Sequence, residues 1–143
     1  MTFPEALSVR WIMTTHVRLV REFGGRLGVR EIGLIDSARL RPLTSFGGQL
    51  IYRPPFTLSG VLWVGLIRNH GFVDGNKRTA TATMARWLVL ESYRLRSDQD
   101  ELVEMAVAIA EKRVEVEQVA DGLAQHAPQG GPRVGRPSTG RGH

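Results

Sequence analysis

The chain has 143 residues, of which 42% are hydrophobic and 23% are charged. This length supports one compact domain with a core and is too short for two ordinary domains. The sequence contains no cysteine, which excludes disulfides and thiolate metal sites, and no apolar run approaches the roughly 20 residues that cross a bilayer. The first ten residues lack a signal-peptide pattern, so we expect a cytoplasmic protein.

The net charge of +5 and the pI near 10.7 are typical of nucleic-acid-binding proteins, but the excess charge lies at one end. Residues 127–143, APQGGPRVGRPSTGRGH, contain three arginines and no acidic residue, and the rest of the chain has 16 basic and 14 acidic side chains. Because 127–143 is rich in proline and glycine and has no apolar period, we predict a disordered tail there. We expect one domain over 1–126 and no specific nucleic-acid partner.

The first predicted element in chain order is a helix from about Val9 to Val20, where apolar residues recur at helical spacing before a stop at Gly24 and Gly25. His16 lies on the apolar stripe of this helix. That position favours a core or partner-facing histidine over a catalytic one.

The rest of the chain predicts mostly helix. A short helix is expected over 36–41, ended by Pro42. Residues 44–56, with two glycines and two prolines, predict a loop or a short β-hairpin. The next helix is apolar nearly all round, and therefore buried, with Thr57 as its cap. Helices are then expected over 57–69, 76–91, 98–111 and 114–125. The predicted fold is an all-α bundle with one small hairpin.

The segment HGFVDGNKRTA, residues 70–80, gathers polar and charged residues between two apolar runs. Its Asp74-Gly75-Asn76 sequence is a turn signal at the start of a predicted helix. The first amides of a helix have no partners inside it and carry the positive end of its dipole. Gly75 allows the backbone to approach a ligand closely.

Lys77 and Arg78 fall in the first turn of that helix, where the dipole disfavours cations. A bound anion removes this conflict, so the pattern predicts a phosphate site. Asp74 is placed to hold a Mg²⁺ ion that bridges to phosphate, and His70 to accept a proton near neutral pH. In the structural alternative, Asp74 caps a helix, the two cations are solvated and His70 belongs to the core. The clustering within nine positions favours a site.

HGFVDGNKRTA resembles the H-x-F-x-D-[GA]-N-K-R-T-A signature of the Doc toxins, a branch of the Fic/Doc (Fido) family. The resemblance extends loosely over about residues 10–125 and implies a Fic/Doc-like helical bundle in which the predicted hairpin is a flap. Nucleotidyl-transferring members of the family carry H-x-F-x-[DE]-G-N-G-R-x-x-R. This chain has Lys77 at their second glycine and Thr81 at their final arginine. These departures point to the Doc branch, in which the γ-phosphoryl group of ATP faces the target hydroxyl.

The resemblance implies a toxin of a type II toxin–antitoxin system that phosphorylates a Ser/Thr hydroxyl of a translation factor, elongation factor Tu, and so arrests translation. It implies ATP and Mg²⁺ as cofactors and a Phd-like antitoxin as partner. The implied catalytic residues are His70, Asp74 and Arg78, the implied ATP-binding residues are Arg68, Gly75, Asn76, Lys77 and Arg78, and the implied metal ligand is Asp74. The flap would pair with target backbone by strand addition.

Three alternatives stay open. Arg68 is equally consistent with a structural arginine at a helix end that extends its charge to solvent. An AMP transferase of the same fold would differ in the phosphate of ATP that reaches the product. A non-catalytic basic binding module would be unaffected by loss of His70.

Overall fold

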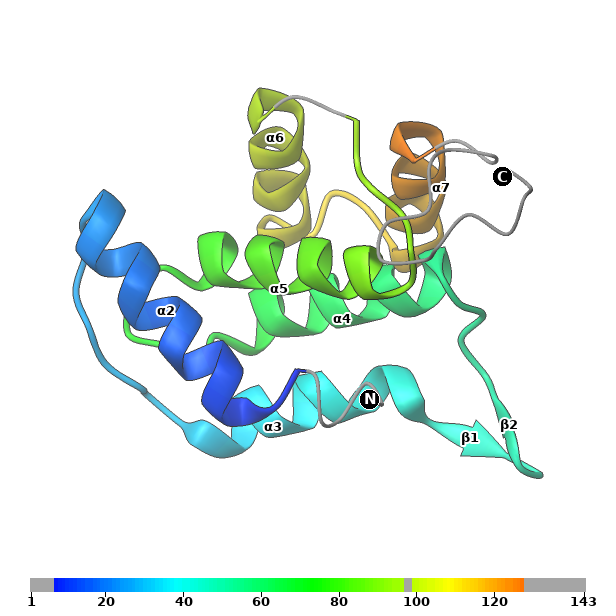
Figure 1. Cartoon of the computed structure of the whole chain (residues 1–143), viewed down its shortest axis with the longest axis horizontal. Helices are drawn as coiled ribbons and strands as arrows, with labels where there is room; N and C mark the ends of the chain where they lie inside the picture. Colours follow the sequence, from blue (N-terminus) through cyan, green and yellow to red (C-terminus); the bar gives the residue numbers. More distant parts are fainter. Residues whose placement is uncertain (1–6, 97–98, 128–143) are drawn as a thin grey trace.

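The computed structural model describes residues 7–96 and 99–127, so the predicted tail lies outside the described residues except for Ala127, which is buried at the end of the last helix. The described part is the expected helical bundle with a small hairpin (Figure 1). Its helices are α2 (Val9–Phe23), α3 (Ile32–Leu40), α4 (Phe56–Asn69), α5 (Asn76–Leu90), α6 (Gln99–Ala110) and α7 (Val116–His126), with a 3₁₀ turn at Arg41–Leu43. Strands β1 (Ser45–Phe46) and β2 (Gln49–Leu50) pair antiparallel.

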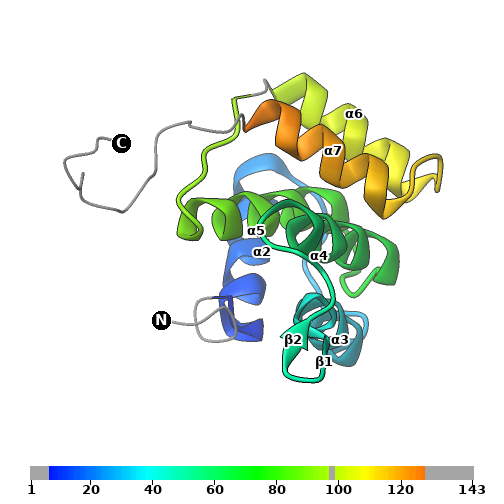
Figure 2. The ribbon, with the colours of Figure 1, turned by 90° about the vertical axis from the view of Figure 1, so that its right-hand side faces the viewer.

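Helix α4 is the centre of the bundle. Every residue from Leu58 to Ile67 is buried, as expected for a helix that is apolar on all sides. In Figures 1 and 2, α5 runs beside α4, while α6 and α7 cover one side and α3 the other. Two glycines of α4 permit close approach, because a Cβ on Gly60 would lie 3.6 Å from the backbone of α7 and one on Gly65 would lie 3.4 Å from Ala38 of α3.

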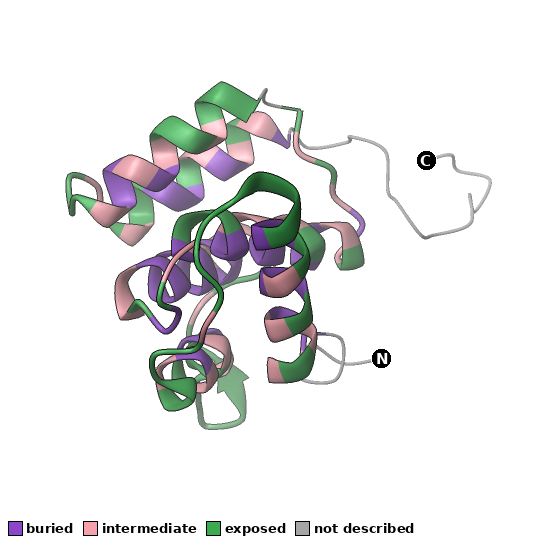
Figure 3. Cartoon of the chain, turned by 90° about the vertical axis from the view of Figure 1, so that its left-hand side faces the viewer, coloured by how far each residue is buried: buried purple, intermediate pink, exposed green. Residues whose placement is uncertain are grey.

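Helix α2 is amphipathic and lies across α5. Ser8 caps it by accepting a hydrogen bond from the Trp11 amide at 3.0 Å. His16 is buried on its inner face together with Ile12 and Leu19, so of the two predicted roles, core or partner-facing, the structure shows the core one. Figure 3 shows the alternation on this side of the molecule, with buried residues turned inward and exposed ones outward. Gly24, with a φ of 93°, ends the helix where the sequence predicted.

Two local predictions are wrong. Helix α3 begins at Ile32 instead of residue 36, because the Glu31 side chain accepts a hydrogen bond from the Gly33 amide and so caps an earlier turn. Thr57 is not a cap. Helix α4 begins one residue before it, with Pro55 as the N-cap residue, and no side chain of the described residues caps that end. The Pro55 carbonyl accepts a hydrogen bond from the Ser59 amide at 3.0 Å. Thr57 therefore lies inside the first turn of the helix.

Within residues 7–96 and 99–127, every helix is too short or too polar to span a bilayer.

Gly71, directly after α4, lies against α3 with no room for a side chain. A Cβ there would overlap the Ile35 side chain. We therefore expect Gly71→Ala to lower the free energy of unfolding by about 1–3 kcal/mol, the usual cost of overpacking, measured by urea denaturation. Gly33→Ala is the control, because Gly33 is exposed in α3 and alanine is the better helix former. A Gly71→Ala protein as stable as the control would contradict the tight contact.

Candidate functional site

The loop between α4 and α5, residues 70–75, is bounded by two residues in the left-handed conformation. His70, the C-cap of α4, has φ 54° and ψ 51°, and Gly75, the N-cap of α5, has φ 75° and ψ 20°. Glycine adopts this region freely, whereas a residue with a Cβ does so at a cost. The His70 side chain is exposed at the end of a buried helix, which makes it accessible to a substrate.

Asn76 closes the loop with its side chain. Its Oδ1 accepts a hydrogen bond from the Phe72 amide, and its Nδ2 donates to the Phe72 carbonyl, both at 2.9 Å. Asn76 is also buried. The sequence predicted Asn76 as part of an anion cradle, and its side chain is already committed to the loop. Any contact that Asn76 makes with an anion would therefore use its main-chain amide.

Residues 26–31, for which the sequence predicted no element, run antiparallel to the loop and hold it along its length. The Val73 amide donates to the Gly28 carbonyl at 3.0 Å, and Val29 forms a β-bridge with Phe72. Next to this pair, the amides of Arg30 and Glu31 both donate to the Gly71 carbonyl, at 2.8 and 3.1 Å. The signal that could have identified the segment is a glycine directly before it and another within it. A Cβ on Gly25 would lie 2.9 Å from an Asp74 carboxylate oxygen, and one on Gly28 would lie 3.1 Å from Val73.

Asp74 is fixed by backbone amides from both sides. Its Oδ2 accepts the Arg26 amide at 3.0 Å, and its Oδ1 accepts the Gly75 amide at 2.9 Å. The hydrogen bond from Arg26 lowers the pKa of Asp74 most, followed by the bond from Gly75, and the charges of Arg26 and Arg78 lower it further. Asp74 is therefore ionised at neutral pH. It precedes the N-cap residue of α5, Gly75, and so differs from the helix cap of the structural alternative.

The N-terminus of α5 lies next to this carboxylate and is open. Among the described residues no side chain caps its first amides, and its first turn contains no acid. Lys77 and Arg78 are both exposed there, and the Arg78 guanidinium lies over the Phe23 ring, 4.8 Å from its centroid. The open helix end and its first-turn cations Lys77 and Arg78 thus follow Asp74 in the chain, and the Arg78 charge acts on the Asp74 carboxylate. Helix N-termini with nearby cations are suited to bind phosphate.

Two further positions have structural partners. Thr81 accepts a hydrogen bond from Trp63 Nε1 at 3.0 Å and donates to the Lys77 carbonyl at 2.7 Å. Arg68, predicted as an ATP-binding residue, donates through Nε to the Ile109 carbonyl at 3.0 Å and through Nη2 to the Val114 carbonyl at 2.7 Å. The Arg68 guanidinium therefore joins α4 to the last turn of α6 and to the connection between α6 and α7. It is not among the side chains that the structure brings to the loop.

His16 lies directly beneath the loop. Its ring stacks on Phe72, with centroids 4.0 Å apart and an interplanar angle of 14°, and its Nδ1 is 3.4 Å from the Thr79 hydroxyl. Its Nε2 has no hydrogen-bond partner among the described residues. Burial lowers the pKa of His16, and the nearby Asp74 carboxylate offsets part of that effect. A neutral imidazole therefore supports the loop from below at neutral pH.

Among the residues that the structure describes, Asp74 is placed to hold a hard cation together with a ligand. In the ranges 7–96 and 99–127, no group of three or more His, Asp or Glu side chains could hold a metal ion. Mg²⁺ is commonly bound by one or two carboxylates with water and substrate phosphates. One ionised carboxylate, Asp74, beside an open helix N-terminus fits that requirement.

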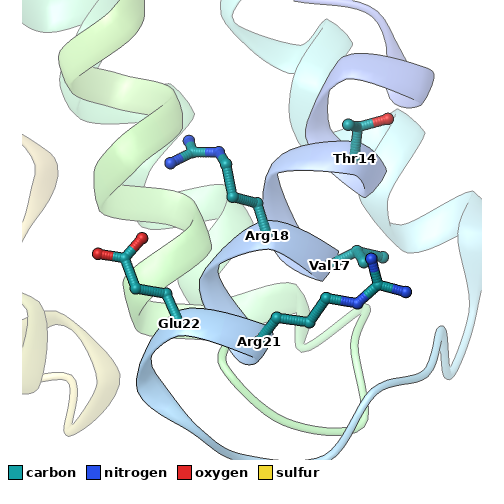
Figure 4. Close-up of a pocket in the computed structure, with 5 residues that line it drawn as sticks. All are labelled: Thr14, Val17, Arg18, Arg21 and Glu22. Carbon is teal, nitrogen blue, oxygen red and sulfur yellow. The ribbon is translucent and has the colours of Figure 1, made fainter.

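A separate hollow lies on the outer side of α2. Thr14, Val17, Arg18, Arg21 and Glu22 line it. Figure 4 shows Arg18 and Glu22 extending from one side of the helix, toward α5, and Arg21 from the other. The hollow shares no residue with the loop or the first turn of α5, so it is a second surface feature.

Two comparisons with known proteins identify relatives of this chain. The sequence pattern of the Fic/DOC family matches residues 6–88, which include the segment 26–31, the loop and most of α5. Over 78 residues the chain is 41% identical to a protein named Toxin Doc from Mycolicibacterium smegmatis. This alignment covers 54% of the chain and 60% of that protein, so the chain spans less than two thirds of its relative's length.

The position of His16 predicts a pH dependence. Because its pKa is lowered in the folded protein, the unfolded chain takes up a proton below about pH 6.5 that the folded protein takes up only at lower pH. The free energy of unfolding should therefore fall as pH falls below that value. We expect His16→Phe, which keeps a flat ring on Phe72, to have a smaller slope between about pH 7 and 5, measured by urea denaturation. Gln125→Ala, at an exposed position of α7 without a titrating group, is the control and should keep the wild-type slope. Equal slopes in all three proteins would exclude the effect.

Proposed function

Because this chain belongs to the Fic/Doc family, and its similarity to a Doc toxin supports the Doc branch, we propose that it is the toxin of a type II toxin–antitoxin pair. It transfers the γ-phosphoryl group of ATP to a Ser or Thr hydroxyl of a translation factor. One observation supports this most: the exposed His70 and the ionised Asp74 share a rigid loop that leads into the open, cationic first turn of α5.

In the proposed reaction the target hydroxyl oxygen attacks the γ-phosphorus. The bond from that phosphorus to the bridging oxygen breaks, and ADP leaves. His70 accepts the hydroxyl proton as general base. Lys77, Arg78 and the first amides of α5 stabilise the negative charge on the phosphoryl oxygens. Phosphoryl transfer asks mainly for positioning and charge stabilisation, so this set of groups is sufficient.

Asp74 is the residue that would hold Mg²⁺ against the phosphates of ATP. When bound, the ion supplies charge neutralisation at the phosphate oxygens. The hydrogen bonds from two main-chain amides to Asp74 fix the orientation of its carboxylate and favour the charged form. A cation binds this charged form. Each carboxylate oxygen accepts one of these hydrogen bonds and keeps a further lone pair with which it would bind the metal.

The γ-phosphoryl group is favoured over AMP as the transferred group by two positions. In nucleotidyl-transferring members of the family, the final arginine of the signature orients the nucleotide for attack at the α-phosphorus. Here Thr81 occupies that position and is bonded to Trp63 and to the Lys77 carbonyl. Lys77 stands where those proteins have glycine, and it adds bulk and charge to the cradle.

Two partners belong to the proposal. The hairpin, where Phe46 is 84% exposed, would pair with the target backbone by strand addition, and the resemblance to Doc toxins favours elongation factor Tu as that target. An acidic segment of a Phd-like antitoxin would bind the hollow on α2, where two cations, Arg18 and Arg21, outnumber the one carboxylate, Glu22. The hairpin and α2 lie at opposite sides of the bundle (Figures 1 and 2), so the two surfaces are separate.

Transfer of labelled phosphate tests the reaction. With elongation factor Tu as target, we expect label from ATP labelled at the γ-phosphate and none from ATP labelled at the α-phosphate. The mass of the target should rise by one phosphate and the co-product should be ADP.

Thr81→Arg should not convert the protein into an AMP transferase, because Lys77 remains. Thr81→Ser, which keeps the hydroxyl, should keep activity.

His70→Ala is the control for chemistry in the same assay. It should abolish label transfer and the growth arrest of a bacterial host while the helical circular dichroism stays intact, because His70 is exposed. Label from the α-phosphate would establish the AMP-transferase alternative instead. Full toxicity of His70→Ala would favour the non-catalytic binding module.

Asp74→Asn tests the metal site. Losing one charged ligand should lower the rate of phosphoryl transfer and shift its Mg²⁺ dependence to higher concentration, so that raised Mg²⁺ recovers part of the rate. Initial rates across a Mg²⁺ titration measure this. Asp121→Asn, an exposed position on α7, is the matched control. An unchanged Mg²⁺ dependence in Asp74→Asn would show that Asp74 acts only on the shape of the loop.

A further inference from the structure

His70 has an unusual backbone for a residue with a side chain. Its φ of 54° and ψ of 51° place it in the left-handed region at the end of α4, where glycine is the usual residue. A histidine adopts this conformation only if its surroundings stabilise it. The direction of its Cα–Cβ bond, and so the position of the imidazole, depends on that backbone conformation.

The side chain of Arg30 binds the backbone at this point. Its Nε donates to the His70 carbonyl at 2.8 Å, and its Nη2 donates to the Asn69 carbonyl at 3.2 Å. One planar guanidinium thus bridges two successive carbonyls at the end of α4. These carbonyls lack partners inside a helix, and a cation at this end is also favoured by the helix dipole.

The main chain of Arg30 fixes the next peptide. Its amide and that of Glu31 both donate to the Gly71 carbonyl, so the carbonyls of three successive residues, 69 to 71, are bound from the same point of the chain. Asn69 adds a bond across to α3, from its Nδ2 to the Leu34 carbonyl at 2.9 Å. The peptide planes on both sides of His70 are therefore held by groups outside α4 and its loop.

We infer that Arg30 is a positioning residue for His70: its guanidinium holds the His70 backbone in the left-handed conformation that directs the imidazole toward the target hydroxyl. This inference rests on the proposed function, in which His70 is the general base. Arg30 itself contacts neither ATP nor the target in this scheme and acts through His70 alone.

A positioning role differs from a purely structural one in what its loss changes. Both bonds of the Arg30 side chain lie at exposed carbonyls, where water can replace the guanidinium, so the fold should survive its removal. A misplaced base slows the chemical step without altering the site that binds the nucleotide. Removal of the Arg30 side chain should therefore lower kcat and leave KM for ATP nearly unchanged.

Three variants test this: Arg30→Met removes the donors and keeps the length, Arg30→Lys keeps one charged donor, and Arg86→Met makes the same change at an exposed position on α5. We expect Arg30→Met to lower kcat about 10- to 100-fold with KM for ATP within about twofold and the melting temperature within a few degrees. Arg30→Lys should lie between Met and wild type. Arg86→Met should match wild type.

The ¹³Cα and carbonyl chemical shifts of His70 give a second measurement that needs no activity. They should leave their left-handed values in Arg30→Met and keep them in Arg86→Met. A wild-type kcat in Arg30→Met, or unchanged His70 shifts, would overturn the inference. If Arg30→Met does not fold, Arg30→Lys decides it: wild-type kcat together with wild-type shifts would overturn it as well. If the wild-type chain transfers no phosphate, the proposed function fails, and the shifts alone decide whether Arg30 holds His70.

Discussion

The antiparallel pairing of residues 26–31 with the loop after α4 is the contact on which the candidate site depends. Three backbone–backbone hydrogen bonds connect the two segments. The Arg26 amide adds a bond to the Asp74 carboxylate, and the Arg30 guanidinium adds a fork to the carbonyls of His70 and Asn69. Without them, a six-residue loop with a histidine in the left-handed region would sample many conformations. With them, the base and the carboxylate have fixed positions relative to α5.

The same pairing links the site to the core. Gly71 lies against Ile35 of α3 with no room for a Cβ, Phe72 is buried and stacks on His16 of α2, and Asn76 holds Phe72 from α5. Three helices therefore converge on one turn of chain. The candidate chemistry is rigid on its inner side and exposed at His70, Lys77 and Arg78, which face outward.

Electrostatics at the start of α5 opposes folding locally and favours binding. Two cations at the positive end of a helix dipole destabilise the isolated helix, and here an uncapped N-terminus adds unpaired amides. Burial of α4 and the packing of α5 against it stabilise the arrangement from elsewhere in the molecule. A local conflict that the rest of the fold maintains is typical of a functional site, and in the proposed function the phosphates of ATP supply the negative charge that resolves it.

The sequence by itself determined the helices, the buried character of α4 and the place of the charged turn, because apolar periodicity and turn residues act over a few neighbouring positions. It also determined the family, through a signature whose residues are consecutive. The sequence did not predict the helix starts at Ile32 and Phe56. Their N-cap residues are Glu31 and Pro55, which are not among the residue types usually preferred as helix caps.

Only the tertiary structure decided which polar side chains are free. The sequence predicted Asn76 and Arg68 as ATP-binding residues, and the fold engages their side chains with Phe72 and with Ile109 and Val114. Thr81, which stands at the final arginine of the family signature, bonds to Trp63. Arg30 had no local pattern at all, since its partners are 39 and 40 residues away along the chain. The type of a residue states which bonds it can make, whereas the partner it meets depends on how distant segments pack.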